Sequence, residues 1–163
     1  KLNLEIIPTQ LGQLLQNVTD GWQVAAKEKQ LSLELRMSSE LQTLQVQTDP
    51  TRLAQILNNL IHNAIKFTHQ GRIEISVTTT TINTKTAIIE CSVTDTGIGI
   101  SAEQQQIIFD RFTQADSSTR RSFGGTGLGL AICKRIIQAM NSELLVESTK
   151  GKGSRFHFTL ALP

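Results

Sequence analysis

Residues 49–71 carry the clearest structural signal in this sequence. Asp49 followed by Pro50 predicts a helix start, because an N-cap carboxylate accepts backbone N–H groups and proline suits the first helical position. Gly71 lies beyond the expected end of the helix. A helix with one apolar face buries that face against another layer of structure. Apolar residues at helical spacing mark the face, namely Leu53, Ile56, Leu57, Leu60, Ile61, Ala64 and Phe67.

Shorter periodic segments surround this helix and set the fold class. Amphipathic helices are expected at residues 9–29 and 127–140, and strand 44–47 is expected to pair with strand 31–35. Helices inserted among strands, with a final hairpin, favour a two-layer α/β sandwich in which a mixed sheet of about five strands packs on three main helices. Alternating or apolar runs predict strands at residues 2–7 (ended by Pro8), 31–35, 44–47, 72–79, 87–95, 143–148 and 154–162, with an exposed connection at 80–86.

Composition is typical of a soluble globular protein. The 163 residues suit one domain spanning 1–163, and the net charge of +2 is too small to indicate nucleic-acid or anionic-membrane binding. The chain has no run of about 18 apolar residues and no apolar signal-peptide core at its start. We therefore expect a cytoplasmic, monomeric domain, and the missing initiator Met suggests a fragment of a longer protein. Cys91 and Cys133 are expected to be buried and reduced.

A polar stripe lies on the helix that begins at Asp49. Asn59 and Asn63 are four residues apart, so they lie one above the other, and Lys66 can share their face. An amide oxygen is a hard, neutral ligand that suits Mg²⁺, and lysine suits phosphate as a point charge. The pattern indicates a metal and phosphate site. The alternative is a solvated face that carries amides.

Two glycine-containing segments carry further chemical signals. Asp95 follows an apolar strand, where its carboxylate can accept from the amine of a base, and Gly97 and Gly99 allow close backbone approach to a flat ring. A plain strand-ending turn is the alternative. Residues 124–129 lead into a helix, whose free N–H groups and dipole favour phosphate, and a flexible linker is the alternative. This second segment is not a P-loop, and Leu130 occupies the last glycine position of the dinucleotide fingerprint.

The two glycine segments are separated by a long stretch without clear periodicity. Residues 96–125 contain one short helix, expected within 101–109. A loop of this length inside a compact domain is usually functional and often a lid.

Taken together, the segments resemble the ATP-binding domain shared by histidine kinases, DNA gyrase, the heat-shock ATP-dependent chaperones and mismatch-repair ATPases. The resemblance to sensor histidine kinases is strongest and covers nearly the whole chain. The matching segments are 59–68 (similar to the asparagine box), 95–100 (first glycine box), 108–112 (phenylalanine box) and 125–130 (second glycine box), and residues 49–53 and 151–156 also fit.

The resemblance implies a role for each matched residue. Asp95 would read the adenine amine, and Asn63 would bind Mg²⁺. Asn59 and Lys66 would act near the phosphates. The other matched residues would shape the base pocket, anchor the lid or hold the phosphates: Gly97, Gly99, Ile100, Phe109, Phe112, Gly125, Thr126, Gly127, Leu128, Gly129 and Leu130.

One difference from the gyrase-type members has a chemical consequence. Those ATPases carry a glutamate four residues before the metal-binding asparagine, and it activates water. Here Asn59 occupies that position, and an amide cannot accept a proton at neutral pH. This favours phosphoryl transfer to a protein nucleophile over hydrolysis, through positioning and charge neutralisation. Arg120 and Arg121 could supply charge at the γ-phosphate, and solvated surface charge is the alternative.

The implied enzyme is a protein-histidine kinase whose acceptor histidine lies outside this chain. His62, His69 and His157 are expected to be structural or surface residues, because none has the helical setting of a phospho-acceptor. The implied cofactors and partners are ATP, Mg²⁺, a dimerising helical domain that carries the acceptor, and a response regulator. The parent protein could be membrane-anchored. A nucleotide-gated ATPase switch and a degenerate, non-catalytic binding module are the alternatives.

Overall fold

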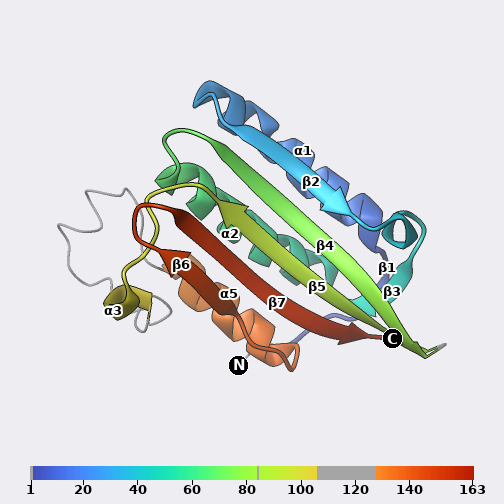
Figure 1. The fold of residues 1–163 in the computed structure, drawn as a ribbon. Helices are drawn as coiled ribbons and strands as arrows, with labels where there is room; N and C mark the ends of the chain where they lie inside the picture. Colours follow the sequence, from blue (N-terminus) through green and yellow to red (C-terminus); the bar gives the residue numbers. More distant parts are fainter. Residues whose placement is uncertain (1, 84, 106–127) are drawn as a thin grey trace.

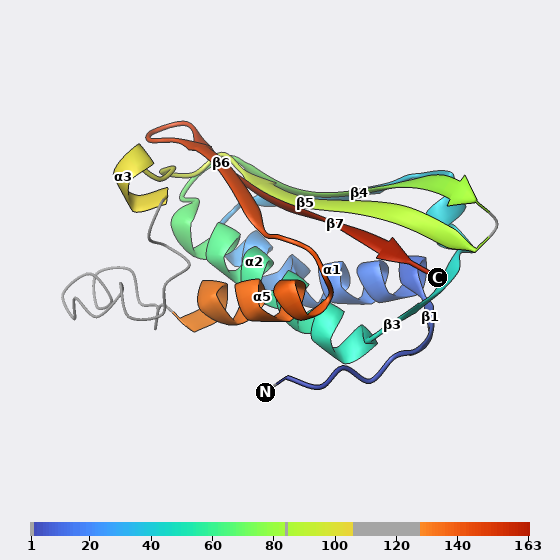
Figure 2. The same ribbon diagram turned by 90° about the horizontal axis from the view of Figure 1, so that it is seen from below.

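A mixed sheet covered on one face by helices forms the body of the molecule (Figure 1 and Figure 2). The computed structural model describes residues 2–83, 85–105 and 128–163. β2 runs parallel to β4, and every other neighbouring pair of this sheet is antiparallel. The expected two-layer α/β sandwich is therefore confirmed. In spatial order the five strands are β2 (Ser32–Met37), β4 (Arg72–Asn83), β5 (Thr86–Asp95), β7 (Gly153–Leu162) and β6 (Leu145–Thr149).

Three long helices form the second layer, as Figure 2 shows from the side. They are α1 (Leu11–Glu28), α2 (Pro50–Phe67) and α5 (Leu128–Ala139). The Asp49 carboxylate accepts the backbone N–H of Arg52 at 3.0 Å, which confirms the predicted N-cap of α2. Two short helices complete the described chain, η1 (Ser39–Gln42) and α3 (Ala102–Gln105). None of the described helices has the length and apolar content needed to cross a membrane.

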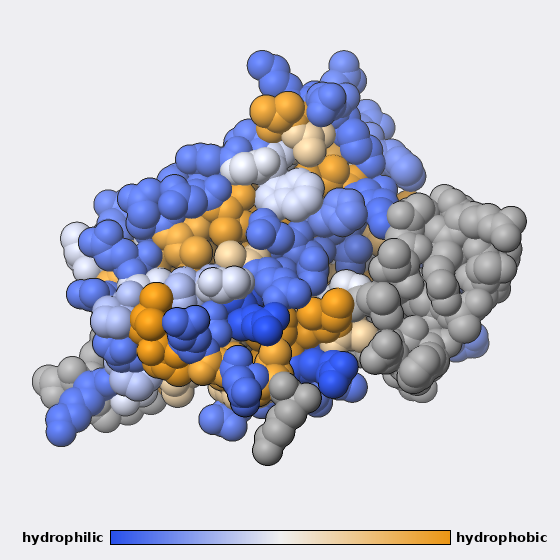
Figure 3. Space-filling model, turned by 180° about the vertical axis from the view of Figure 1, so that it is seen from behind, coloured by the Kyte–Doolittle hydropathy of each residue, from blue (hydrophilic) through white to orange (hydrophobic). Residues whose placement is uncertain are grey.

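The core lies between the sheet and the helices because the strands alternate their side chains. In β7, Phe156, Phe158 and Leu160 are buried, while the residues between them are more exposed. Register places Phe158 beside Cys91 of β5, so the buried rows of neighbouring strands are continuous. Figure 3 shows the helical face, opposite to the view of Figure 1, with hydrophilic residues over most of it and smaller apolar patches between them.

A separate two-stranded ribbon corrects two sequence predictions. β1 (Ile7–Gln10) pairs with β3 (Gln45–Thr48), so the strand expected at residues 2–7 was misplaced. Pro8 lies inside β1. Each strand of a two-stranded ribbon has one unpaired edge, and a residue facing that edge needs no backbone N–H, so proline is tolerated. β3 therefore does not pair with the strand at 31–35, which pairs with β4 instead. Four-residue strands carry too short an apolar pattern to specify their partner.

The β4–β5 hairpin is longer than predicted. The connection expected at residues 80–86 is largely strand, because β4 continues to Asn83 and β5 begins at Thr86. The threonines of this segment are β-branched and favour extended backbone. The two central antiparallel strands thus span ten or more residues each, from the hairpin to Asp95 at the opposite end.

Candidate nucleotide-binding site

Asp95 is the last residue of β5 and is held between two neighbouring strands. Its register partners are Ile73 on β4 and Ser154 on β7, and only 8% of its surface is exposed. The backbone N–H of Gly97 donates to Asp95 Oδ1 at 2.8 Å. Burial raises the pKa of the Asp95 carboxyl, and backbone hydrogen bonds from Gly97 and Ser154 oppose that rise. The site thus holds a carboxylate whose charge is partly compensated and can accept from a ligand amine.

The glycines after Asp95 are required by close contacts with two other elements. A Cβ at Gly97 would collide with the Phe67 carbonyl oxygen at the end of α2 and would lie 2.8 Å from Thr68 Oγ1. Gly99 has φ of +73° and its backbone approaches the Thr149 carbonyl group, which leaves no room for a side chain. The loop is therefore packed directly against the end of α2, and the Ile98 N–H donates to the Phe67 carbonyl at 3.2 Å.

The predicted polar face of α2 lies on the same helix whose C-terminal end contacts this loop. Asn59, Asn63 and Lys66 are all partly buried. Asn63 precedes Phe67 by four residues, which is about 6 Å along the helix. Burial lowers the pKa of Lys66, whose Nζ lies 5.9 Å from the centroid of the Phe67 ring. The loop after Asp95 and the amide-bearing end of α2 thus form one continuous region.

The start of α5 borders the same helix. Asn59 Nδ2 donates to the Gly129 carbonyl oxygen at 3.4 Å, and Leu130 is partly buried against the core. Leu128 is the first residue of α5, and Ile100 is also partly buried against the core. Seven predicted site residues lie outside the described part of the chain: Phe109, Phe112, Arg120, Arg121, Gly125, Thr126 and Gly127. The lid prediction falls largely on the same segment, and α3 lies within the expected short helix.

Ser148 is a supporting residue that the sequence did not reveal. Its Oγ accepts the Ile100 N–H at 2.7 Å and lies 2.8 Å from the Gly153 carbonyl oxygen and 2.7 Å from Ser154 Oγ. It therefore ties the glycine loop to β7 beside Asp95. The predicted final hairpin brings Ser148 beside Ser154, but no local pattern indicates the contact of Ser148 with Ile100. The sequence pattern also indicates no role for Thr68. Its side chain is fully buried, and its Oγ1 has no hydrogen-bond partner among the described residues.

Two of the three histidines contact neighbouring side chains, and His69 is exposed. The His62 ring stacks on Trp22 with centroids 5.5 Å apart, and burial followed by the charge of Lys66 lowers its pKa. Trp22 Nε1 donates to Asn58 Oδ1 at 2.8 Å, which joins α1 to α2. His157 pairs with Glu147 at 3.1 Å on the outer face of the sheet.

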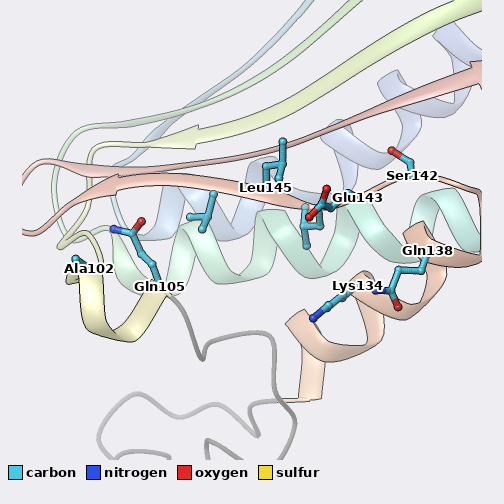
Figure 4. Close-up of a pocket in the computed structure, with 9 residues that line it drawn as sticks. Ala102, Gln105, Lys134, Gln138, Ser142, Glu143 and Leu145 are labelled. Atoms are coloured by element: carbon cyan, nitrogen blue, oxygen red, sulfur yellow. The ribbon is translucent and has the colours of Figure 1, made fainter.

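A separate cavity of about 720 Å³ lies between α3, α5 and the start of β6 (Figure 4). Lys134 and Gln138 reach towards it from α5, while Glu143 and Leu145 line the strand side. Its lining residues include none of the predicted site residues. The candidate site is therefore the region around Asp95 and α2, and the cavity is distinct from it.

Comparison with known protein sequences shows the family of the chain. A family model described as "Histidine kinase-, DNA gyrase B-, and HSP90-like ATPase" matches residues 48–163. The whole chain is 44% identical over 163 residues to the sensor protein GacS of Pseudomonas syringae pv. syringae and spans 18% of that protein. Over 162 residues, or 99% of the chain, it is 40% identical to the signal transduction histidine-protein kinase BarA of Escherichia coli (strain K12), again spanning 18%.

Solved structures show the same likeness. Full-length ShkA in complex with AMPPNP superposes with a TM-score of 0.80 at 33% identity, covering 99% of this chain and 32% of ShkA. The nucleotide-free catalytic domain of histidine kinase ThkA superposes with a TM-score of 0.74 at 26% identity, covering 96% of this chain and 95% of that domain. The chain belongs to the family of histidine kinase-, DNA gyrase B- and HSP90-like ATPases, and within that family to the catalytic domains of sensor histidine kinases.

Proposed function

We propose that residues 1–163 form one catalytic domain that binds ATP with Mg²⁺ and supplies the γ-phosphoryl group to a histidine on a helical domain of the same kinase. The main supporting observation is the packing of the loop after Asp95 against the end of α2, which carries Asn63 and Lys66. Two further facts support ATP as the ligand. The family is described as histidine kinase-, DNA gyrase B- and HSP90-like ATPases, and the structurally similar ShkA forms a complex with AMPPNP.

The residues present fit this ligand chemically. The buried Asp95 carboxylate is an acceptor suited to the exocyclic amine of adenine. The amide oxygens of Asn63 and Asn59 are neutral oxygen donors of the type that Mg²⁺ accepts. The Lys66 side chain lies on the same helix one turn after Asn63 and suits a phosphate group. Bound Mg²⁺ would neutralise charge on the phosphates, and Arg120 and Arg121 would add positive charge there.

The proposed chemistry is transfer to a protein nucleophile. The bond between the γ-phosphorus and the bridging oxygen of ATP breaks, a bond forms between that phosphorus and an imidazole nitrogen, and ADP leaves. The domain contributes mainly by positioning the nucleotide and compensating charge. Asn59 donates its N–H to Gly129 and carries no proton-accepting group at neutral pH, so a general base for water is missing at this position.

Transfer in trans tests this function directly. The domain is mixed with a separate helical hairpin that carries the acceptor histidine of the parent kinase, together with γ-labelled ATP and Mg²⁺. We expect acid-labile label on the hairpin, none on a hairpin with histidine replaced by alanine, and little release of free phosphate. Rapid phosphate release without labelling would instead establish an ATPase switch. Absence of ATP binding by titration would instead establish a degenerate binding module.

The setting of the domain in its parent protein belongs to the same proposal. The chain spans 18% of GacS and of BarA, so the acceptor domain and the receiver of the phosphate would be supplied by other parts of the parent or by separate proteins. We propose that this domain is cytoplasmic and monomeric by itself, and that the phosphate passes from histidine to a response regulator. Labelling of a response regulator only when the hairpin is present checks this order of transfer.

A further inference from the structure

The side chain of Gln105 connects α3 to the loop after Asp95 and to the edge of the sheet. Its Nε2 donates to the carbonyl oxygen of Ile100 at 2.8 Å and to the carbonyl oxygen of Ser148 at 2.9 Å. Gln105 is the last residue of α3, and Ser148 lies on β6, an edge strand. Figure 4 shows the side chain reaching from α3 towards the strands. One half-buried amide therefore holds three segments together.

Both partners of this amide are acceptors, which determines its orientation. A glutamine amide has two N–H donors on its nitrogen and an acceptor oxygen on the other side. The carbonyl oxygens of Ile100 and Ser148 can only accept, so both select the nitrogen of Gln105. The position therefore requires a neutral side chain with two donors, and a glutamate of the same size could not replace it.

Side chains from two other elements hold both backbone polar groups of Ile100. Its N–H donates to Ser148 Oγ at 2.7 Å, and its carbonyl oxygen accepts from Gln105. At the other end of the same loop, the Gly97 N–H donates to Asp95 Oδ1 at 2.8 Å. The loop is therefore held at its start by the carboxylate of the candidate site and at its end by Ser148 and Gln105.

We propose that Gln105 is a positioning residue that holds the loop after Asp95 in the conformation that receives the base of the nucleotide. This inference rests on the proposed function, because the loop affects binding only if the base lies beside Asp95. A loop that is ordered before the ligand arrives loses less conformational freedom on binding. Gln105 therefore strengthens binding of the base. Its two partners lie on the loop and on β6, so it acts independently of the proposed metal site on α2.

The chain provides a matched control in the preceding residue. Gln104 has the same side chain and lies on the same short helix, but it is exposed. Replacing Gln104 changes the composition and charge of α3 in the same way as replacing Gln105. It leaves the two hydrogen bonds from Gln105 Nε2 in place, so a difference between the two positions reports on those bonds.

The test compares Gln105→Ala and Gln105→Glu with Gln104→Ala and Gln104→Glu. Glutamate keeps the size of the side chain but places a carboxylate against two carbonyl oxygens, so its effect at position 105 should exceed that of alanine. The first measurement is made by NMR on ligand-free protein. It records the carbonyl carbon shifts of Ile100 and Ser148 and the exchange rate of the Ile100 N–H.

The second measurement is nucleotide affinity at a temperature at which every variant is fully folded. A residue that only stabilises the fold would leave the affinity of folded molecules unchanged under these conditions. Adenosine reports on the base-binding part of the site, and ATP with and without Mg²⁺ reports on the metal-dependent part.

We expect Gln105→Ala to shift both carbonyl signals and to speed exchange of the Ile100 N–H. The affinities for adenosine and for ATP should fall by the same factor, roughly three- to tenfold, as for loss of one or two neutral hydrogen bonds. Gln105→Glu should lower them further. The strengthening of ATP binding by Mg²⁺ should stay as in wild type, and both Gln104 variants should match wild type.

Unchanged Ile100 signals in the Gln105 variants would overturn the positioning role. Affinity losses equal to those of the Gln104 variants, or confined to the Mg²⁺-dependent part of ATP binding, would overturn it as well. A wild-type protein that bound neither adenosine nor ATP would refute the proposed function instead, and the ligand-free NMR comparison would still decide whether Gln105 holds the loop.

Discussion

At the scale of the residue, Asp95 combines burial with a small set of local partners. Strand pairing fixes its backbone on both sides, and Gly97 approaches so closely that its N–H bonds to the carboxylate. Ionised carboxylates are costly to bury unless they are well compensated. Burial of the Asp95 carboxylate therefore reduces the stability of the ligand-free fold, and the proposed function gives this carboxylate the role of recognising the base.

Replacing Asp95 with Asn tests the recognition role. A hydrogen bond to a charged group contributes about 1.5–3 kcal/mol, so we expect ATP affinity to fall roughly 10- to 100-fold. Isothermal titration measures the change, with the exposed Asp20→Asn on α1 as the control for charge removal. An unchanged dissociation constant for the Asp95 variant would mean that this carboxylate does not read the base.

The same substitution, which should weaken ATP binding, should increase the free energy of unfolding relative to wild type as pH rises. Burial raises the pKa of Asp95 above its ordinary 3.8, so the folded protein binds this proton more tightly than the unfolded chain does. The stabilisation is therefore complete below pH 3.8 and is lost as pH rises through the raised pKa. We expect Asp95→Asn to gain stability relative to wild type across that window, measured by urea denaturation at several pH values. Parallel pH profiles would contradict this.

At the scale of the element, α2 carries the proposed phosphate-binding face, and its C-terminal end is capped by Lys29, the residue that follows α1. Lys29 Nζ donates to the carbonyl oxygens of Ile65 and Lys66, at 2.5 and 3.3 Å. A cation at a helix C-terminus satisfies free carbonyls and interacts favourably with the helix dipole. The turn that holds Lys66 is thus fixed by a residue far from it in sequence.

Lys29→Met should loosen this helix end while keeping the aliphatic stem. We expect a loss of about 1 kcal/mol in the free energy of unfolding, the usual value for one such hydrogen-bonded cap. Chemical denaturation measures it, and the exposed Lys27→Met in the last turn of α1 serves as control. Equal losses for the two variants would show that only general charge matters.

At the scale of the whole molecule, stability depends on the core that the described residues form between the sheet and the helices. Phe158 lies on β7, an interior strand between β5 and β6, with 1% of its surface exposed, and the neighbouring Thr159 is exposed. We expect Phe158→Ala to lower the free energy of unfolding by about 3–5 kcal/mol. Thr159→Ala should change it by less than about 0.5 kcal/mol. Urea denaturation of the two variants checks this, and similar losses would contradict the assigned faces.

Sequence patterns predicted the parts of this molecule that depend on local periodicity. The predicted N-cap at Asp49 and the predicted apolar stripe of α2 are confirmed. Both could be predicted because they depend only on residues close together in the sequence. The pairing of β1 with β3, by contrast, depends on which short strands meet in space. The predicted roles of Asn63 and Asp95, which rest on residue chemistry and on the family resemblance, stay predictions, because the contacts of the described residues do not test them. Ser148 could not be found locally because its contacts come from Ile100 and from across the β6–β7 pair.

Titration of ATP into the domain, with and without Mg²⁺, is the most direct measurement of the proposed site, using wild type and Asn63→Ala. We predict that Mg²⁺ strengthens ATP binding to the wild type, and that Asn63→Ala loses this strengthening while keeping its affinity for adenosine. Equal Mg²⁺ dependence in both proteins, or none in the wild type, would contradict a nucleotide cleft built from Asp95 and the amide face of α2.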